Sequence, residues 1–315
     1  MPFLGAALSF LMMMLLPGTE ASGGTWCYAT QDATCAPARW KVLAPQCGGV
    51  NQSPINVDRK TARRSNELDA FVFKGYNTAP AGAWSIVNSG HAVQVNLGSG
   101  ISVSGAGLPA EYNALQFHFH WGKPDGNGSE HQLDGNWYPM EVHIVHMHSK
   151  YTDIKVAVTD PNGLAVLGFF FKVSDTDNSN YNTIIDGLQS VRYSGGSVDL
   201  ASTFRLDSLL PSENLLSRYY RYWGSLTTPG CAEAVIWTVF EDPIPISSAQ
   251  LNAFVNSVHF SASGKTEVKM QDNYRPVQAL NSRRIYASKQ ASMSSSTSPA
   301  LSSVLLFPLL AIRLL

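Results

Sequence analysis

Apolar runs bounded by turn residues are the feature that most constrains how this chain can fold. Six such runs are rich in Val, Ile, Phe and Trp: residues 83–95, 115–121, 140–148, 154–158, 165–173 and 234–240. Clusters of Gly, Pro, Asn and Asp separate them, as is typical of β-strands. Residues 179–191 and 248–257 are the best helical candidates. No low-complexity linker interrupts residues 25–287, so we predict one mainly β domain with short helices.

The charge balance excludes a protein built to bind nucleic acid. The 22 Lys and Arg residues face 23 Asp and Glu residues, and the formal net charge is −1. This leaves no basic excess to neutralise phosphates. With 44% apolar and 14% charged residues, the chain has the composition of a globular protein and not of a disordered one.

The amino-terminal segment predicts export. Residues 4–16 form an uncharged apolar run, followed by Pro17, Gly18 and the small pair Ala21 and Ser22. This is the pattern of a secretory signal peptide, here residues 1–21, with cleavage after Ala21. The alternative is a buried first helix, which would be expected to show polar positions on one face.

The carboxyl-terminal segment predicts a lipid anchor. Residues 304–315 are apolar apart from Arg313, and this run is shorter than the roughly 17–25 residues that a spanning helix needs. The uncharged, serine-rich stretch before it completes a glycosylphosphatidylinositol attachment signal. We expect attachment at Ser294, with Ala291 and Ser288 as alternatives, removal of residues 295–315, and a location on the extracellular face of the cell membrane. The alternative is a terminal strand or helix packed on the core.

The four cysteines fit an oxidising compartment. Cys27, Cys35, Cys47 and Cys231 allow two disulfides in three connectivities. We favour Cys27 with Cys35, which closes a short loop, and Cys47 with Cys231, which closes a long one. A zinc site made of the four thiolates is disfavoured because no CxxC spacing is present.

Two histidine-bearing runs indicate a metal site. In the first run, strand periodicity places His118 and His120 on one face and three aromatic residues on the other. In the second, Glu141 and His143 share a face and His146 lies opposite. If the two strands are antiparallel neighbours, three neutral imidazoles converge, which with an open position is the ligand set of a catalytic zinc site.

Two polar residues support this interpretation. Gln116 and Glu141 each precede a histidine by two residues on the same strand face, where they can hold the second ring nitrogen of His118 and His143. The alternative is that these histidines are hydrogen-bonded interior residues or part of a polar sheet face.

A series of motifs in one order resembles the α-class carbonic anhydrases, and with the two end signals their membrane-anchored, isozyme-four-like branch. The motifs are QSPIN at residues 52–56, SGH at 89–91, QFHFHWG at 116–122, GSEH at 128–131, EVHIVH at 141–146, GLAVLG at 163–168, SLTTP at 225–229 and DNYRP at 272–276. The resemblance covers nearly all of residues 25–287.

This resemblance implies a central mixed, mostly antiparallel sheet of about ten strands in a catalytic domain of residues 22–294. It implies one Zn2+ per chain and reversible hydration of CO2 to bicarbonate and a proton through zinc-bound hydroxide. The implied partners are CO2, water, bicarbonate, the membrane through its anchor, and bicarbonate transporters.

The resemblance also implies roles for single residues. His118, His120 and His143 match the zinc ligands, and their partners are Gln116, the backbone carbonyl of Asn273, and Glu141. Thr227 matches the residue that accepts a hydrogen bond from zinc-bound hydroxide, and Glu130 matches the carboxylate that accepts a hydrogen bond from Thr227. His91 matches the proton shuttle. The wall for CO2 matches Val145, Val166, Leu226, Thr227, Thr228, Val235 and Trp237. His131 and His146 match buried hydrogen-bonding residues.

Some positions depart from the family pattern. Ser89 and Gln94 stand where Asn is common beside the shuttle, which leaves the efficiency of proton transfer open.

Asn127 begins the sequon Asn127-Gly128-Ser129, a predicted glycosylation site. The alternative functions are a catalytically silent binding or adhesion module and a soluble secreted structural protein.

Overall fold

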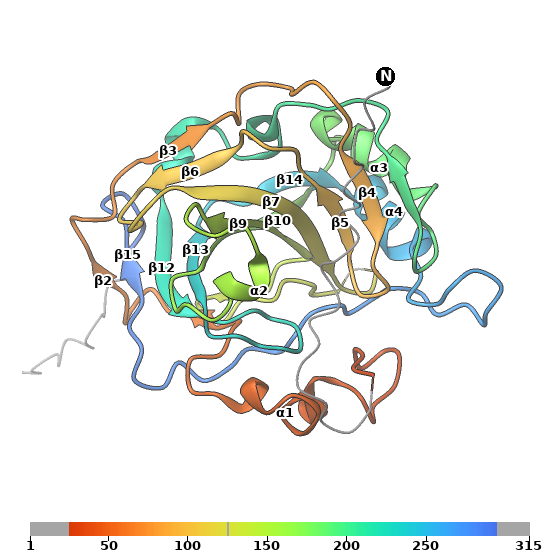
Figure 1. The fold of residues 1–315 in the computed structure, drawn as a ribbon, viewed down its shortest axis with the longest axis horizontal. Coiled ribbons are helices and arrows are strands. Elements are labelled where there is room, and N and C mark those ends of the chain that lie inside the picture. Colours follow the sequence, from red (N-terminus) through yellow and green to blue (C-terminus); the bar gives the residue numbers. More distant parts are fainter. Residues whose placement is uncertain (1–24, 125, 295–315) are drawn as a thin grey trace, which may run out of the picture.

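The computed structural model describes residues 25–124 and 126–294. The predicted signal peptide and the predicted propeptide, residues 295–315, lie outside the described residues. No helix within the described ranges is long and apolar enough to cross a membrane. The described chain is organised around one large sheet of 13 strands (Figure 1).

Four long strands form the centre of the sheet: β7 (Tyr112–Trp121), β9 (Met140–His148), β10 (Leu164–Ser174) and β13 (Val235–Phe240). They lie in this order, with β7, β9 and β10 antiparallel and β13 parallel to β10. From Leu164 to Phe171 every residue of β10 is buried, which explains its nearly continuous apolar sequence.

Shorter strands extend the centre on both sides. The sheet continues from β7 through β5 (Val93–Asn96), β4 (Ser85–Asn88) and β11 (Ser197–Asp199), and from β13 through β12 (Tyr219–Gly224), β15 (Tyr286–Ala287) and β2 (Arg63–Arg64). Three more strands branch from this path: β3 (Phe71–Lys74), β6 (Ser102–Gly105) and β14 (Ile244–Ser247). A separate pair joins β1 (Asn56–Val57) to β8 (Gln132–Leu133). The predicted mixed, mostly antiparallel sheet is confirmed, and the main path alone has the expected ten strands.

Each face of the sheet carries its own apolar cluster. The first contains Phe117, Phe119 and Trp121 of β7. The second, on the face of the histidines, contains Val166 of β10 and Trp237 of β13. The pairing of β7 with β9 shifts register between Ala114 and Gln116, which is the mark of a β-bulge.

The helices are short. They are α1 (Trp40–Leu43), α2 (Ile154–Ala157), α3 (Asn182–Leu188) and α4 (Ser248–Ser257), with 3-10 turns η1 (Pro37–Arg39), η2 (Pro45–Gly48), η3 (Ser179–Tyr181), η4 (Leu206–Leu209) and η5 (Glu213–Ser217). The prediction for α4 is confirmed to the residue, and a capping box between Ser247 and Gln250 begins it. Residues 179–191 form η3 and α3 in place of one longer helix.

Two strand predictions were wrong. Within residues 154–158, Ile154–Ala157 form α2 and Val158 is its C-cap, because the Asp153 side chain accepts a hydrogen bond from the backbone N of Lys155 at 2.8 Å and so caps a helical turn. The run 83–95 is two strands, β4 and β5, joined by a turn in which Gly90 has φ 83°. This left-handed conformation favours glycine and ends the first strand.

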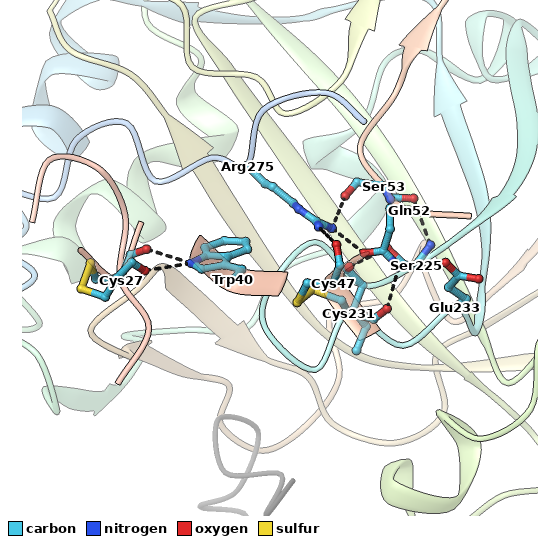
Figure 2. The surroundings of a disulfide bond; sticks show 11 residues. Cys27, Trp40, Cys47, Gln52, Ser53, Ser225, Cys231, Glu233 and Arg275 are labelled. Atoms are coloured by element: carbon cyan, nitrogen blue, oxygen red, sulfur yellow. Dashed lines mark hydrogen bonds between the residues drawn. A yellow bond between two sulfur atoms is a disulfide. The ribbon is translucent and has the colours of Figure 1, made fainter. Parts of the chain in front are cut away.

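Both disulfides that the sequence favoured are present. Cys27 bonds to Cys35 and Cys47 bonds to Cys231, and the described residues contain no free cysteine. The first bond closes a loop of the amino-terminal segment. The second joins the segment that precedes β1 to the loop between β12 and β13 (Figure 2).

Candidate metal centre

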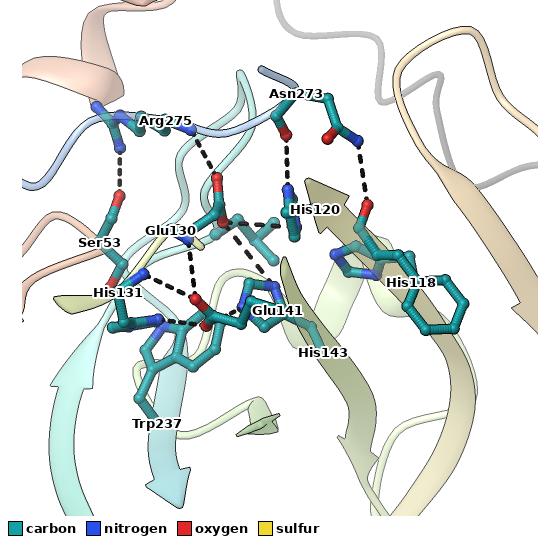
Figure 3. Close-up of polar contacts among 12 residues, drawn as sticks. Ser53, His118, His120, Glu130, His131, Glu141, His143, Trp237, Asn273 and Arg275 are labelled. Carbon is teal, nitrogen blue, oxygen red and sulfur yellow. Dashed lines mark hydrogen bonds and ion pairs between the residues drawn. The ribbon is translucent and has the colours of Figure 1, made fainter. Parts of the chain in front are cut away.

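Two neighbouring strands bring the three predicted zinc ligands together. In the ladder between β7 and β9, His118 lies directly opposite His143, and His120 points to the same face two residues further along β7. The ring centroids are 5.0 Å apart for His118 and His120, 5.3 Å for His118 and His143, and 4.7 Å for His120 and His143. One nitrogen from each ring lies within 4.8 Å of the other two (Figure 3). One ion can contact all three with little movement of the rings.

The other nitrogen of each ring is already held. It donates to an oxygen acceptor in all three cases: His118 Nδ1 to Gln116 Oε1 at 2.9 Å, His120 Nδ1 to the carbonyl of Asn273 at 2.7 Å, and His143 Nε2 to Glu141 Oε1 at 2.6 Å. A neutral imidazole that donates from one nitrogen presents a lone pair on the other. The nitrogens left for a metal are therefore Nε2 of His118, Nε2 of His120 and Nδ1 of His143.

This donor set fits zinc. His120 Nε2 is buried and has no hydrogen-bond partner among the described residues, and a bound ion would satisfy it. Burial, reinforced by the neighbouring histidines, holds the pKa of His118 well below its ordinary value, and burial also lowers the pKa of His120. Both rings are thereby kept in the neutral form that binds metal. Three imidazole nitrogens are a common catalytic zinc set.

Glu141 supports the cluster as a buried, charged anchor. Its Oε1 also accepts from His131 Nδ1 at 2.7 Å, and its Oε2 accepts from the backbone N of Glu130 and of His131, each at 2.8 Å. Burial opposes ionisation of Glu141, but His131 and His143 outweigh it and hold the pKa of this carboxyl well below its usual range. His131 is fully buried and also bonds Tyr222 Oη at 2.7 Å, which confirms its predicted role as a buried hydrogen-bonding residue.

Glu130 places a free carboxylate oxygen beside the ligands. Its Oε1 accepts from the backbone N of Arg275 at 2.7 Å. Its Oε2 has no hydrogen-bond partner in residues 25–124 and 126–294 and lies 3.5 Å from His120 Nε2 and 3.9 Å from His143 Nδ1. Thr227 is nearly buried and faces the same cavity. The implied hydrogen bond from Thr227 to Glu130 is absent among the described residues.

The metal-facing nitrogens open into a cavity of about 110 Å3. Since a water molecule occupies about 30 Å3 in the liquid, the cavity holds a few waters or one small substrate. Six of the predicted wall residues line it: Val145, Val166, Leu226, Thr227, Thr228 and Trp237. Val235 is fully buried in the second apolar cluster and does not line the cavity. Val235 points to the same face of β13 as Trp237 but lies two residues earlier in the strand.

His91 lies on the cavity wall, in the turn between β4 and β5. Its ring stacks on Trp26, with centroids 3.7 Å apart and planes 15° from parallel. Burial lowers the pKa of His91 to about 4. Sequence reasoning missed Trp26. The one available signal was its position next to Cys27, which ties the amino-terminal segment to the domain.

Helix α2 contributes a part of the cavity that sequence reasoning also missed. Ile154, Lys155 and Val158 line the opening, whereas the run was expected to be a strand. The signal that could have found them is Asp153, a preferred helix N-cap residue directly before the run.

The loop that presents Thr227 is tied down at both ends (Figure 2). Ser225 and Ser53 exchange hydrogen bonds of 2.9 and 3.0 Å, and Gln52 Nε2 donates to the carbonyl of Cys231 at 3.1 Å. The guanidinium of Arg275 donates to the carbonyl of Cys47 at 2.9 Å. The long-range disulfide, the loop of Thr227 and the backbone that holds Glu130 therefore form one connected unit.

The remaining predicted sites lie on the surface. Asn127 is exposed. Ser294 is partly exposed, and its hydroxyl donates to Asp134 Oδ2 at 3.2 Å. Of the alternative attachment residues, Ser288 is fully buried and Ala291 is 2% exposed, so modifying either would require this segment to leave the core.

Comparison with known proteins is consistent with this geometry. The family profile described as eukaryotic-type carbonic anhydrase matches residues 35–289. Carbonic anhydrase 15 of Mus musculus is 47% identical over 296 residues, covering 92% of this chain and 91% of its own. Carbonic anhydrase 4 of Oryctolagus cuniculus is 36% identical, with 92% of each chain covered. Carbonic anhydrase 12 of Homo sapiens is 35% identical and covers 90% of this chain and 79% of its own.

Proposed function

The chain belongs to the eukaryotic-type carbonic anhydrases, and from this membership we propose that it catalyses the reversible hydration of CO2 to bicarbonate and a proton on the extracellular face of the cell membrane. One observation carries the proposal: three imidazoles from β7 and β9 converge at the base of a largely apolar cavity. Zinc bound there supplies hydroxide at neutral pH, because it lowers the pKa of a coordinated water to about 7, a value established for carbonic anhydrases in general.

The chain's own residues bind and orient the reactants. The valines and Trp237 of the wall offer an apolar place for CO2, which is itself apolar. Thr227 accepts a hydrogen bond from the attacking oxygen and thereby orients it. Glu130 Oε2, which is otherwise unpartnered among the described residues, accepts a hydrogen bond from the Thr227 hydroxyl once the two approach.

His91 is the proposed proton shuttle. Its place on the cavity wall supports this role, since a proton must leave the site in every hydration cycle. A transfer group works best when its pKa lies near the working pH. Burial in its stack with Trp26 lowers the pKa of His91 to about 4, so we propose that it acts as a slow shuttle at neutral pH.

Export, anchoring and glycosylation are proposed from the sequence. We place the anchor on Ser294, which the burial of Ser288 and Ala291 favours, and a glycan on the exposed Asn127. Phosphatidylinositol-specific phospholipase C should release the protein from the surface of expressing cells. If the protein stays on the membrane after this treatment, the proposed anchor is wrong. Bicarbonate transporters are the proposed protein partners.

Metal analysis and stopped-flow CO2 hydration test the activity. The purified protein should contain one zinc per chain and lose its activity to a chelator. His143→Ala should lose both zinc and activity, because two imidazoles remain where three are needed. His148→Ala, at the partly buried end of β9 and outside the cavity, is the matched control and should retain both. An unchanged hydration rate in His143→Ala would contradict the enzyme assignment.

A further inference from the structure

One lysine stands at the cavity opening with no counter-charge among the residues that the structure describes. Among the described residues that line the cavity, Lys155 is the only Lys, Arg, Asp or Glu. It is an exposed residue of α2, which lies beside β9 over the middle of the sheet face (Figure 1). Lys155 therefore presents a positive charge to a molecule that enters the cavity.

Neighbouring carboxylates do not neutralise this ammonium. Asp153, the nearest acid in sequence, directs Oδ1 to the backbone N of Lys155 at 2.8 Å. In the described part of the chain Lys155 Nζ forms no ion pair, whereas Lys150, five residues earlier, pairs with Asp160 at 2.8 Å. Glu130 and Glu141 are fully buried beneath the ligands. The side-chain charge of Lys155 therefore stays available at the mouth of the cavity.

We propose that Lys155 is an anion-selecting residue of the active site, which raises the affinity of the cavity for bicarbonate and other small monovalent anions. The inference rests on the proposed function. A charge at the rim of a cleft with apolar walls concentrates ions of opposite sign in it. CO2 is neutral and bicarbonate is an anion, so Lys155 acts on the binding of bicarbonate and of anionic inhibitors. The overall equilibrium of the reaction is unaffected by any change in the protein.

Anion binding to the cobalt-substituted protein tests this without relying on activity. Co2+ replaces Zn2+ as a visible reporter of its ligands, and thiocyanate is titrated at low ionic strength into the wild type and the variants Lys155→Gln and Lys155→Arg. Imidazole, which is largely neutral at mildly alkaline pH, is the uncharged probe. Lys265→Gln is the matched control, since Lys265 is exposed and lies outside the cavity. This substitution makes the same change in net charge as Lys155→Gln.

Lys155→Gln should weaken thiocyanate binding about two- to fivefold, with imidazole binding unchanged. Lys155→Arg and Lys265→Gln should bind thiocyanate like the wild type, and the difference should shrink in high salt. Equal effects of Lys155→Gln and Lys265→Gln, equal weakening of both probes, or no effect at all would overturn the inference. If the wild type takes up no cobalt and binds no anion, the proposed function itself fails.

Discussion

Buried histidines serve different purposes in this fold, and the contacts of their two nitrogens tell them apart. Each ligand ring uses one nitrogen on the protein and leaves one free. His146, on the other face of β9, uses both: Nε2 bonds the Tyr76 hydroxyl at 2.6 Å and Nδ1 the carbonyl of Ala165 at 3.2 Å. A ring with both nitrogens engaged has no lone pair to offer a metal, which confirms the structural role expected for His146.

His146 should destabilise the fold in acid. Burial lowers its pKa to about 4, whereas a histidine in an unfolded chain has a pKa of about 6.5. Between these values the unfolded state binds a proton that the folded state does not. The free energy of unfolding should therefore fall as the pH drops through this window, by up to about 3 kcal/mol from this residue.

Urea unfolding at stepped pH measures this effect. The wild type should lose more stability between about pH 6.5 and pH 4 than His146→Gln, which keeps a polar group near Tyr76 but does not titrate. The free energy of unfolding is plotted against pH for each protein, and the difference between the two slopes isolates His146 from other groups with lowered pKa values. Parallel slopes would show that His146 does not contribute.

Trp26 should control the basicity of His91. Trp26→Ala removes the stacked indole and exposes the imidazole, so the pKa of His91 should rise from about 4 toward its ordinary value. Proton transfer at neutral pH should then become faster, and kcat in weak buffer should increase severalfold. Trp26→Phe, which keeps an aromatic neighbour, is the control. An NMR titration of His91 that is the same in Trp26→Ala and the wild type would contradict this account.

At the scale of elements, local capping decides where helices begin. Ser247 precedes α4, its hydroxyl accepts from the backbone N of Gln250 at 3.1 Å, and the Gln250 side chain accepts from the backbone N of Ser247 at 3.3 Å. Ser247→Ala should lower the free energy of unfolding by about 1 kcal/mol. Ser248→Ala, at the exposed next position, should cost much less. Equal losses in the two variants would show that the cap is not what stabilises this end.

Capping also explains which elements could be predicted. The long strands follow from alternation and apolar composition, and α4 follows from its serine cap. Residues 154–158 were misassigned because Ile and Val favour strands, while the deciding contact is the Asp153 cap. The histidine-bearing strands were predictable for a different reason, because polar and apolar side chains alternate along them.

At the scale of the whole molecule, the Cys47–Cys231 bond constrains the unfolded chain most. It joins residues 184 apart in sequence, against 8 for Cys27–Cys35. In the chain-entropy account, replacing the long-range pair with serines should cost about 5 kcal/mol, and replacing the short-range pair about 2–3 kcal/mol. Urea unfolding of the two double variants measures both costs. An equal or larger loss from the short-range pair would contradict the entropic account.

The candidate site was predictable only in part, because some of its contacts join segments that lie far apart in the sequence. His118, His120 and His143 lie on strands whose pairing could be anticipated, and their partners Gln116 and Glu141 are two residues away. The placements of Trp26 on His91 and of Lys155 at the opening depend on how a disulfide loop and a short helix pack against the sheet. No periodicity in the sequence encodes those contacts.

The bulge in β7 takes up one surplus residue of the strand. Before it, the even-numbered Tyr112 and Ala114 belong to the first apolar cluster, and after it the odd-numbered Phe117 does, while even-numbered histidines face the cavity. Leu115 is the residue that the ladder with β9 skips, so deleting it would leave unbroken alternation in which Tyr112, Ala114 and Phe117 still share one face and the imidazoles the other. A single-codon deletion at this position should therefore spare both zinc binding and the buried face, although it lies only three residues before a metal ligand.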